Sequence, residues 1–334
     1  MKKIAFFEIK KWEEQYLKER LKNFELKFFE DGLTKKNIDK VKDFDAVSVF
    51  IYSKIDKELL ERFSNLKLIV TRSTGFDHIE LEGCKKGKIT ICNVPHYGEN
   101  TVAEHTFALI LALSRKIYES YEKVKKGNFS LEGLTGFDLK DKTIGIVGMG
   151  SIGRYVARIA KGFEMNILAY DVTKDLKFAK RFGLKYVGLN DLLKNSDIIS
   201  LHVPYNKKTH HLINKNNLKL IKKGSILINT ARGGIVETDT LLRGLSKRIF
   251  SGVGLDVLEE ECFIKEEKQL LAKQFPKKYD LAVVLKNHIL LTHENCIITP
   301  HNAFNSKEAL IRILDTTILN IKFFFKGKKE NIVK

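Results

Sequence analysis

Short runs of β-branched and aliphatic residues alternate along the chain with longer stretches in which apolar and charged residues recur at helical spacing. In the first part, the runs at residues 4–7, 26–29, 46–51 and 66–70 predict strands, and residues 10–22 and 57–63 predict helices. Strands that alternate with helices are typical of βαβ units, in which the strands are parallel. The pattern therefore predicts an α/β fold.

The same alternation returns after a loop marked by Pro95 and Gly98. Strands are expected at residues 143–147, 166–170, 197–201, 224–229, 251–255 and 297–299, a charged, partly helical connection at 262–296, and a last helix at 307–326. We therefore predict two Rossmann-like, doubly wound parallel-sheet domains with a cleft between them. The last helix is expected to pack on the first domain.

The helix expected to begin near Thr101 has an unusual distribution of apolar residues. Thr101 and Glu104 have the spacing of a capping box. Residues 107–113 are apolar on every side, and such a helix is expected to be buried all round. This predicts that the helix packs at a domain or subunit interface.

A glycine-rich turn follows the strand expected at 143–147. Gly148, Gly150 and Gly153 fit the G-x-G-x-x-G pattern, in which the glycines allow a tight turn, close approach of a pyrophosphate, and close packing of helix on strand. The next expected strand ends at Asp171, at the distance along the chain expected for an acid that binds a ribose hydroxyl. A carboxylate there repels a 2′-phosphate, so the cofactor is predicted to be NAD, although the nearby Lys174 leaves tolerance of NADP open.

Three candidate catalytic residues follow three other expected strands. Arg232 follows residues 226–229, Glu261 follows residues 252–256 and His301 follows residues 297–299. Ligands bind at the carboxyl ends of the strands in an open parallel sheet. A cation to anchor a carboxylate, an imidazole to give a proton and a carboxylate to keep that imidazole charged suit the reduction of a keto acid.

The chain has 59 basic and 41 acidic residues, a formal net charge of +18. The lysines are scattered in pairs and do not alternate with aromatic residues, so the charge is interpreted as a solvated surface and not as a nucleic-acid site. It is still expected to attract anionic ligands modestly.

No apolar run approaches the roughly 18 residues of a membrane span, and residues 1–10 lack a secretory apolar core. The four cysteines show neither C-x-x-C spacing nor a matching histidine cluster, which favours free thiols over a disulfide or a metal site. A cytoplasmic protein is expected, without a metal, a membrane or a nucleic acid as partner.

Several ordered motifs make the chain similar to a known family. They lie at residues 73–78, 93–95, 103–106, 148–153, 202–204, 228–233, 254–257 and 299–301. Taken together they resemble the D-isomer-specific 2-hydroxyacid dehydrogenases over essentially the whole length, most nearly the D-lactate dehydrogenase branch. The resemblance implies an NAD-dependent oxidoreductase.

The resemblance also implies a domain organisation. A discontinuous, flavodoxin-like substrate domain, residues 1–99 plus 300–334, encloses an NAD-binding Rossmann domain at residues 100–299. A homodimer is implied through the coenzyme domain, which agrees with the apolar helix after Thr101.

Residue roles carry over to this sequence as follows. Arg232 binds the substrate carboxylate, His301 is the acid in keto-acid reduction and the base in the reverse reaction, and Glu261 orients and charges the imidazole. Glu261 is chosen from the acidic run 259–261 because it lies five residues past Asp256, as in the family. Asp256 itself resembles the partner of the nicotinamide carboxamide. The cofactor-binding positions implied are Gly148, Gly150, Ser151, Ile152, Gly153, Asp171, Val203, Pro204, Thr209, Thr230, Ala231 and Asp256.

On the substrate side, backbone amides of Thr74 and Gly75 are implied at the carboxylate. Tyr97 and Phe304 match pocket positions of the D-lactate branch, where aromatic rings enclose a methyl group. Residues 301–304 depart from the H-x-G-[SA] form common in the glyoxylate, hydroxypyruvate and phosphoglycerate enzymes. Reduction of pyruvate to D-lactate is therefore predicted, with a larger 2-keto acid as the alternative.

Two further interpretations come from other functional classes. One is a non-catalytic, NAD-sensing scaffold of the same fold, against which the combination of Arg232, Glu261 and His301 argues. The other is nucleic-acid binding, against which the scattered charge argues. The remaining histidines are interpreted as structural: His210 and His211 as loop or cap residues, and His105 as a buried helix residue.

Overall fold

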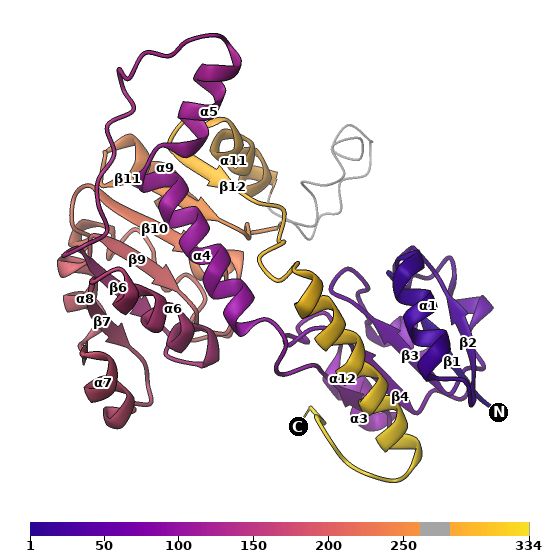
Figure 1. Ribbon diagram of the computed structural model, residues 1–334. Coiled ribbons are helices and arrows are strands. Elements are labelled where there is room, and N and C mark those ends of the chain that lie inside the picture. Colours follow the sequence, from indigo (N-terminus) through magenta and orange to yellow (C-terminus); the bar gives the residue numbers. More distant parts are fainter. Residues whose placement is uncertain (261–280, 334) are drawn as a thin grey trace. The chain divides into compact units, whose positions relative to one another are not determined.

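The computed structural model describes residues 1–260 and 281–333 (Figure 1). The chain divides into two compact units: Met1–Tyr97 with Ser306–Lys334, and Gly98–Asn305. The first unit therefore takes its residues from both ends of the sequence, whereas the second is continuous. None of the helices in the described part of the chain is long and apolar enough to span a membrane.

The first unit is built on a five-stranded parallel sheet with the order β2-β1-β3-β4-β5. Its strands are β1 (Lys2–Phe6), β2 (Phe24–Phe28), β3 (Ala46–Val49), β4 (Leu68–Thr71) and β5 (Thr90–Cys92), and its helices are α1 (Lys11–Arg20), η1 (Ile38–Lys40), α2 (Lys57–Glu61), α3 (Leu81–Lys86) and α12 (Lys307–Phe325). This order is that of flavodoxin-like sheets, in which the chain reverses direction across the sheet between its first and third strands.

Both faces of this sheet are buried, as the continuous apolar runs of the sequence require. Successive residues of β1 point to opposite faces, so that Ile4 and Phe6 belong to one apolar cluster and Ala5 to the other. The apolar side of α12, with Leu314 and Ile318, completes the cluster around Ile4 and Phe6. The C-terminal helix thus supplies part of the core of the N-terminal sheet (Figure 1).

The second unit is built on a seven-stranded parallel sheet with the order β12-β11-β10-β9-β6-β7-β8. Its strands are β6 (Thr143–Val147), β7 (Asn166–Tyr170), β8 (Leu184–Tyr186), β9 (Ile198–Leu201), β10 (Ser225–Asn229), β11 (Phe250–Leu255) and β12 (Cys296–Ile298). Its helices are α4 (Glu99–Ser114), α5 (Ile117–Lys125), α6 (Ser151–Gly162), α7 (Leu176–Phe182), α8 (Leu189–Asn195), η2 (Leu218–Leu220), η3 (Gly233–Ile235), α9 (Thr238–Ser246) and α11 (Leu281–Thr292). The two parallel-sheet α/β domains predicted from the sequence are confirmed.

The strand order of the second sheet reverses between β6 and β9. From β6 the chain moves outward through β7 to β8, and then returns to β9 on the other side of β6 and continues to β12. In open α/β sheets, ligands bind at the carboxyl ends of the strands at such a switch point. The glycine turn follows β6 and therefore lies at this switch point.

Helix α4 differs from the sequence expectation in two respects. It begins at Glu99 with Gly98 as its N-cap, so the capping box expected at Thr101 is wrong, because Thr101 lies inside the first turns and is buried. The helix packs on α6 and on β10 and β11, but Ala108 is exposed. Within the single chain the helix is therefore not buried on every side.

Candidate functional site

The three glycines after β6 meet different steric demands. Gly148 has φ of +101°, and a Cβ there would lie 2.6 Å from the carbonyl oxygen of His202. A Cβ on Gly153 would lie 2.0 Å from the carbonyl oxygen of Gly148. The protein itself therefore requires glycine at both positions.

Gly150 is different, since a Cβ there would meet no protein atom within 4 Å. Gly150 is also the N-cap of α6, and no side chain of the described residues caps that helix. The space in front of Gly150 and the amides of the first turn, including those of Ser151 and Ile152, are thus suited to a phosphate. This combination fits the pyrophosphate of a dinucleotide.

Asp171, directly after β7, is tied to the glycine turn. One carboxylate oxygen accepts a hydrogen bond from the Met149 N–H at 2.6 Å, and the other accepts one from the Thr173 N–H at 2.8 Å. The carboxylate is fixed beside the turn and keeps further acceptor capacity, because each oxygen has two lone pairs. This is the placement that a ribose-binding acid needs.

The other predicted cofactor positions follow β9 and β10 at the same edge of the sheet. Thr209 donates its hydroxyl hydrogen to the Pro204 carbonyl at 2.6 Å, which closes the loop that begins at Val203. Thr230 lies 3.1 Å, oxygen to oxygen, from the Thr106 hydroxyl of α4, and the Ala231 N–H donates to the Asn229 side chain at 3.1 Å. These contacts fix both loops at the switch point and beside it.

His202, at the end of β9, is a residue whose environment the sequence did not indicate. Burial lowers the pKa of its imidazole to about 3, so the ring is neutral. Nε2 lies 2.8 Å from the Ser200 hydroxyl, and among the described residues Nδ1 has no partner. The neutral ring lies behind the glycine turn, because the backbone of the same residue packs against Gly148.

The loop after β12 is built around Asp256, which is 1% exposed. Its carboxylate accepts hydrogen bonds from the Thr299 hydroxyl at 2.5 Å and from the N–H groups of Asn302 at 2.9 Å and Ala303 at 2.8 Å. His301, in the middle of this loop, has a left-handed backbone with φ of +53°. A non-glycine residue keeps this conformation only where its surroundings enforce it, and here Asp256 supplies that enforcement.

His105 adds a further partner to the same loop. Its Nε2 lies 3.0 Å from the Thr299 hydroxyl oxygen and 3.6 Å from the nearer oxygen of Asp256. Because the hydroxyl hydrogen goes to the carboxylate, the imidazole donates its Nε2 hydrogen to Thr299. His105 lies on helix α4, as expected, but its expected burial is wrong, since it is partly exposed and contacts the loop that carries His301.

Arg232 follows β10, the strand between β9 and β11. Its backbone carbonyl accepts a hydrogen bond from the Asn229 side chain at 2.9 Å, and its Nη1 donates to the Ala231 carbonyl at 2.8 Å. Arg232 and His301 therefore lie at the carboxyl edge of one sheet, after strands separated by β11 alone. Glu261, the third predicted catalytic residue, lies outside the described residues.

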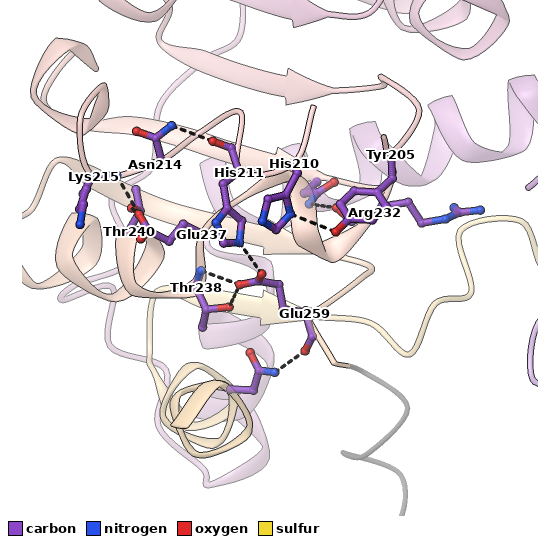
Figure 2. Close-up of polar contacts among 12 residues, drawn as sticks. Tyr205, His210, His211, Asn214, Lys215, Arg232, Glu237, Thr238, Thr240 and Glu259 are labelled. Atoms are coloured by element: carbon purple, nitrogen blue, oxygen red, sulfur yellow. Dashed lines mark hydrogen bonds and ion pairs between the residues drawn. The ribbon is translucent and has the colours of Figure 1, made fainter. Parts of the chain in front are cut away.

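Two residues before Glu261, the carboxylate of Glu259 is enclosed by polar partners (Figure 2). It accepts hydrogen bonds from His211 Nε2 at 2.6 Å and from the N–H and hydroxyl groups of Thr238 at 2.9 and 2.5 Å. His211 lies in a loop, as expected, and in addition contacts this carboxylate. No sequence pattern indicated this contact, because the two residues are 48 positions apart and come from different loops.

The predicted substrate-side residues Thr74, Gly75 and Tyr97 belong to the first unit. The Thr74 hydroxyl donates to the Val94 carbonyl at 3.0 Å. Among the hydrogen bonds of the described residues, none has the N–H of Thr74 or Gly75 as donor, so these amides are available to an anion. The Tyr97 carbonyl accepts from Arg312 Nε at 2.6 Å. Phe304 belongs to the second unit, where it lies next to Gly98.

Hydrogen bonds from buried and charged groups also connect the loops at the carboxyl ends of the strands in the first sheet. Arg72, 2% exposed, donates to the carbonyls of Phe7 and Glu8 at 2.6 and 2.9 Å. The Glu8 carboxylate in turn accepts from the N–H groups of Phe50 and Tyr52 at 2.7 and 2.8 Å. The loops after β1, β3 and β4 are thereby tied together next to Thr74.

The cysteines and the metal-binding residue types form no further site in the described part of the chain. Cys84, Cys92 and Cys296 are free thiols, and burial raises the pKa of Cys84 and Cys92 to about 11. Residues 1–260 and 281–333 contain no group of three or more His, Cys, Asp or Glu side chains that could hold a metal ion.

Comparison with known proteins gives consistent matches over the whole chain. Residues 107–303 match the model of the D-isomer specific 2-hydroxyacid dehydrogenase, NAD binding domain. The chain is 40% identical to the D-lactate dehydrogenase of Aquifex aeolicus, solved with NAD and lactic acid, with a TM-score of 0.89 over 99% of this chain and 98% of that one. It is 33% identical to the D-lactate dehydrogenase of Escherichia coli, over 98% of both chains. It is also 36% identical to a glyoxylate reductase of Thermococcus litoralis, over 87% of this chain and 83% of that protein.

Proposed function

Because the chain belongs to the D-isomer-specific 2-hydroxyacid dehydrogenases, which are NAD-dependent oxidoreductases, we propose that it reduces pyruvate to D-lactate with NADH. The reaction converts pyruvate, NADH and a proton into D-lactate and NAD⁺. The observation that carries the proposal is the loop of residues 299–304, in which Asp256 holds His301 at the sheet edge that also bears the glycine turn and Arg232.

The cofactor has a suitable site in the second unit. The amides that follow Gly150 would hold the pyrophosphate of NAD, and Asp171 would accept hydrogen bonds from its adenosine ribose. When bound, NADH supplies the hydride. The loops that carry Val203 and Thr230, at the switch point and beside it, would hold the nicotinamide end of the cofactor.

The protein supplies the charge and the proton. Arg232 binds the substrate carboxylate through its guanidinium, whose two parallel N–H groups match the two oxygens. His301 donates the proton to the keto oxygen in reduction and removes it from the hydroxyl in oxidation. Glu261 matches the family's carboxylate partner of this imidazole, and we assign to it the role of orienting the ring before the transfer.

The choice of pyruvate rests on the substrate-side residues. The amides of Thr74 and Gly75, which donate to none of the described residues, are suited to a carboxylate, and Tyr97 and Phe304 match the positions at which aromatic rings enclose a methyl group in the D-lactate branch. The 40% identity to a D-lactate dehydrogenase along the whole chain supports this choice over glyoxylate.

The test follows NADH absorbance with purified protein and pyruvate, 2-ketobutyrate, phenylpyruvate, hydroxypyruvate and glyoxylate as substrates. D-lactate and L-lactate are oxidised with NAD in parallel. We expect the largest kcat/KM for pyruvate, and oxidation of D-lactate alone. A preference for a bulkier acid or for glyoxylate would replace the proposed substrate, and no turnover despite tight NADH binding would favour the sensing scaffold.

We further propose that the protein is a homodimer in the cytoplasm. Around α5 the single chain exposes the apolar and aromatic side chains of Ile117, Tyr118, Tyr121, Val124, Phe129 and Leu131. Apolar side chains gathered in this way mark an interaction surface. Light scattering is expected to give twice the mass of 38.3 kDa, and a Tyr121→Lys variant is expected to shift the protein toward monomer.

A further inference from the structure

The Glu259 carboxylate is enclosed by polar partners from another loop and from the start of α9 (Figure 2). Its side chain is 14% exposed, and both oxygens accept hydrogen bonds, Oε1 from His211 and Oε2 from Thr238. Since a carboxylate only accepts, the imidazole must carry a hydrogen on Nε2. The contact to the Thr238 N–H lies at the first residue of α9, where negative charge is favourable.

The other side of His211 is attached to the turn that follows Arg232. The His211 N–H donates to the Gly234 carbonyl at 2.8 Å, and the His211 carbonyl accepts from Asn214 at 2.7 Å. Its ring stacks on that of His210 with 3.8 Å between centroids. His211 has φ of +47°, a left-handed backbone that these contacts hold in place.

The turn at residues 232–234 also packs directly on the chain that leads to Glu259. A Cβ on Gly233 would lie 2.0 Å from the carbonyl carbon of Leu258 and 2.3 Å from the Glu259 nitrogen. A Cβ on Gly234 would lie 2.7 Å from the ring of Tyr205. The turn is therefore packed closely against the backbone that leads to Glu259 and against the ring of Tyr205.

We propose that His211 and Glu259 are a positioning pair, which fixes the turn at residues 232–234 and thereby aims the Arg232 guanidinium at the substrate carboxylate. The pair acts through Arg232 and does not itself touch the substrate. This inference rests on the proposed function of Arg232. Glu259, the first residue of the acidic run at residues 259–261, thus has its hydrogen bonds supplied from within the protein.

Breaking the pair should affect the substrate more than the cofactor. The glycine turn and Asp171 belong to β6 and β7, on the far side of the switch point from β10 and β11. A displacement of about 1 Å at a positioning group can cost up to 10²-fold in rate. We therefore expect Glu259→Ala and His211→Ala each to raise the KM for pyruvate about 10-fold, with the NADH dissociation constant within about two-fold of wild type.

Two further variants separate positioning from general stability. His211→Gln keeps a side-chain N–H that can donate to Glu259, and is expected to retain a KM close to that of wild type. Asp239→Asn removes a carboxylate of α9 that pairs with Lys286 at 2.7 Å and does not contact the turn. It is expected to leave the KM unchanged, so it controls for loosened packing of α9 on α11.

The experiment measures pyruvate kinetics, NADH titration and thermal melting for the four single variants and the double variant His211→Ala/Glu259→Ala. The effects of two residues that act as one unit should not add. The KM of the double variant is therefore expected to equal that of the single variant with the higher KM. An unchanged KM in an active enzyme, additive effects, or equal losses of NADH and pyruvate binding would overturn the inference. If Glu259→Ala fails to fold, His211→Ala and its rescue by His211→Gln decide the outcome. A wild-type protein that reduces no 2-keto acid would instead contradict the proposed function, and the inference with it.

Discussion

The carboxylate of Asp256 accepts a hydrogen bond from the backbone N–H of Asn302, with 2.9 Å between the nitrogen and Oδ1. The end of β11 is thereby joined to the residue that follows His301 in the chain. Thr299 and Ala303 donate to the same carboxylate, so the donors lie on both sides of His301. A buried acid that accepts three hydrogen bonds from one loop determines the shape of that loop.

Replacing Asp256 with asparagine should therefore disturb the position of the proton donor. An amide oxygen can accept from two donors but not readily from three, and the NH₂ group would face one of the existing donors. We expect Asp256→Asn to lower kcat for pyruvate reduction by about 10- to 100-fold. Steady-state kinetics combined with NADH titration separates this role from a contact with the cofactor: weaker NADH binding at unchanged kcat would argue against it.

Removal of the imidazole should stop the chemistry and leave the cofactor site intact. We expect His301→Ala to reduce turnover by about 10²- to 10⁴-fold, the range for loss of a general acid. The NADH dissociation constant should change little, because His301 acts on the substrate. His288→Ala, on α11, is the control. Loss of NADH affinity in His301→Ala would contradict the assignment.

Arg232→Lys tests whether the planar guanidinium is required. A lysine keeps the charge but replaces two parallel hydrogen bonds with a single point contact. We expect the KM for pyruvate to rise about 10- to 100-fold, which corresponds to the loss of one charged hydrogen bond. Arg243→Lys, on the exposed side of α9, should leave the kinetics unchanged. Equal KM values for Arg232→Lys and wild type would exclude the carboxylate-binding role.

Cofactor preference should depend on Asp171. Without its carboxylate, a 2′-phosphate is no longer repelled, and we expect Asp171→Ala to shift the ratio of kcat/KM for NADPH over NADH by about 10-fold toward NADPH. Asp175→Asn is the matched control, since Asp175 lies nearby, pairs with Arg154 at 2.8 Å and caps α7. A preference that stays the same would show that another group excludes NADPH.

The first unit should lose stability in acid through Asp45. Burial alone raises the pKa of Asp45, but hydrogen bonds from the Lys2 side chain, the Lys3 N–H and the Lys67 side chain outweigh it and lower the pKa from 3.8 to about 2. A depressed pKa means that the stabilisation is present above pH 3.8 and is lost as the pH falls toward 2. It should amount to about 2 kcal/mol of unfolding free energy.

This prediction can be measured with the fluorescence of Trp12, the single tryptophan of the chain, which lies on α1 in the same unit. Urea unfolding of wild type and Asp45→Asn should differ at pH 6 and converge toward pH 2. Asp43→Asn removes an exposed carboxylate paired with Lys3 at 2.7 Å, and should change stability little at either pH. A constant difference between wild type and Asp45→Asn across this range would refute the assignment.

The sequence allowed most of the framework to be predicted, because buried parallel strands leave continuous apolar runs. The strand expected at 143–147 is β6, and that expected at 166–170 is β7, with identical bounds. The short strands β5 and β8 were not predicted, since three residues carry too little periodicity. The cap of α4 was misplaced because a capping box is a local pattern, and here Gly98 begins the helix instead.

The candidate site was predictable where a motif requires a particular residue, as at Gly148 and Gly153. It was not predictable where the contact joins distant loops. His105 and Thr299 are 194 positions apart, and neither shows a pattern that identifies the other. The same holds for His211 and Glu259, which follow β9 and β11, two strands separated by β10, and meet only in the folded sheet.

The division of the first unit between the two ends of the chain has a consequence for biosynthesis. The face of its sheet that carries Ile4 and Phe6 is completed by Leu314 and Ile318 of α12, which are synthesised after the whole of the second unit. The second unit is continuous, and its own core residues are all available before α12 leaves the ribosome. The five-stranded sheet of the first unit therefore completes its core after the second unit. A chain that stops before residue 306 would retain the seven-stranded sheet and expose an apolar surface on the five-stranded sheet.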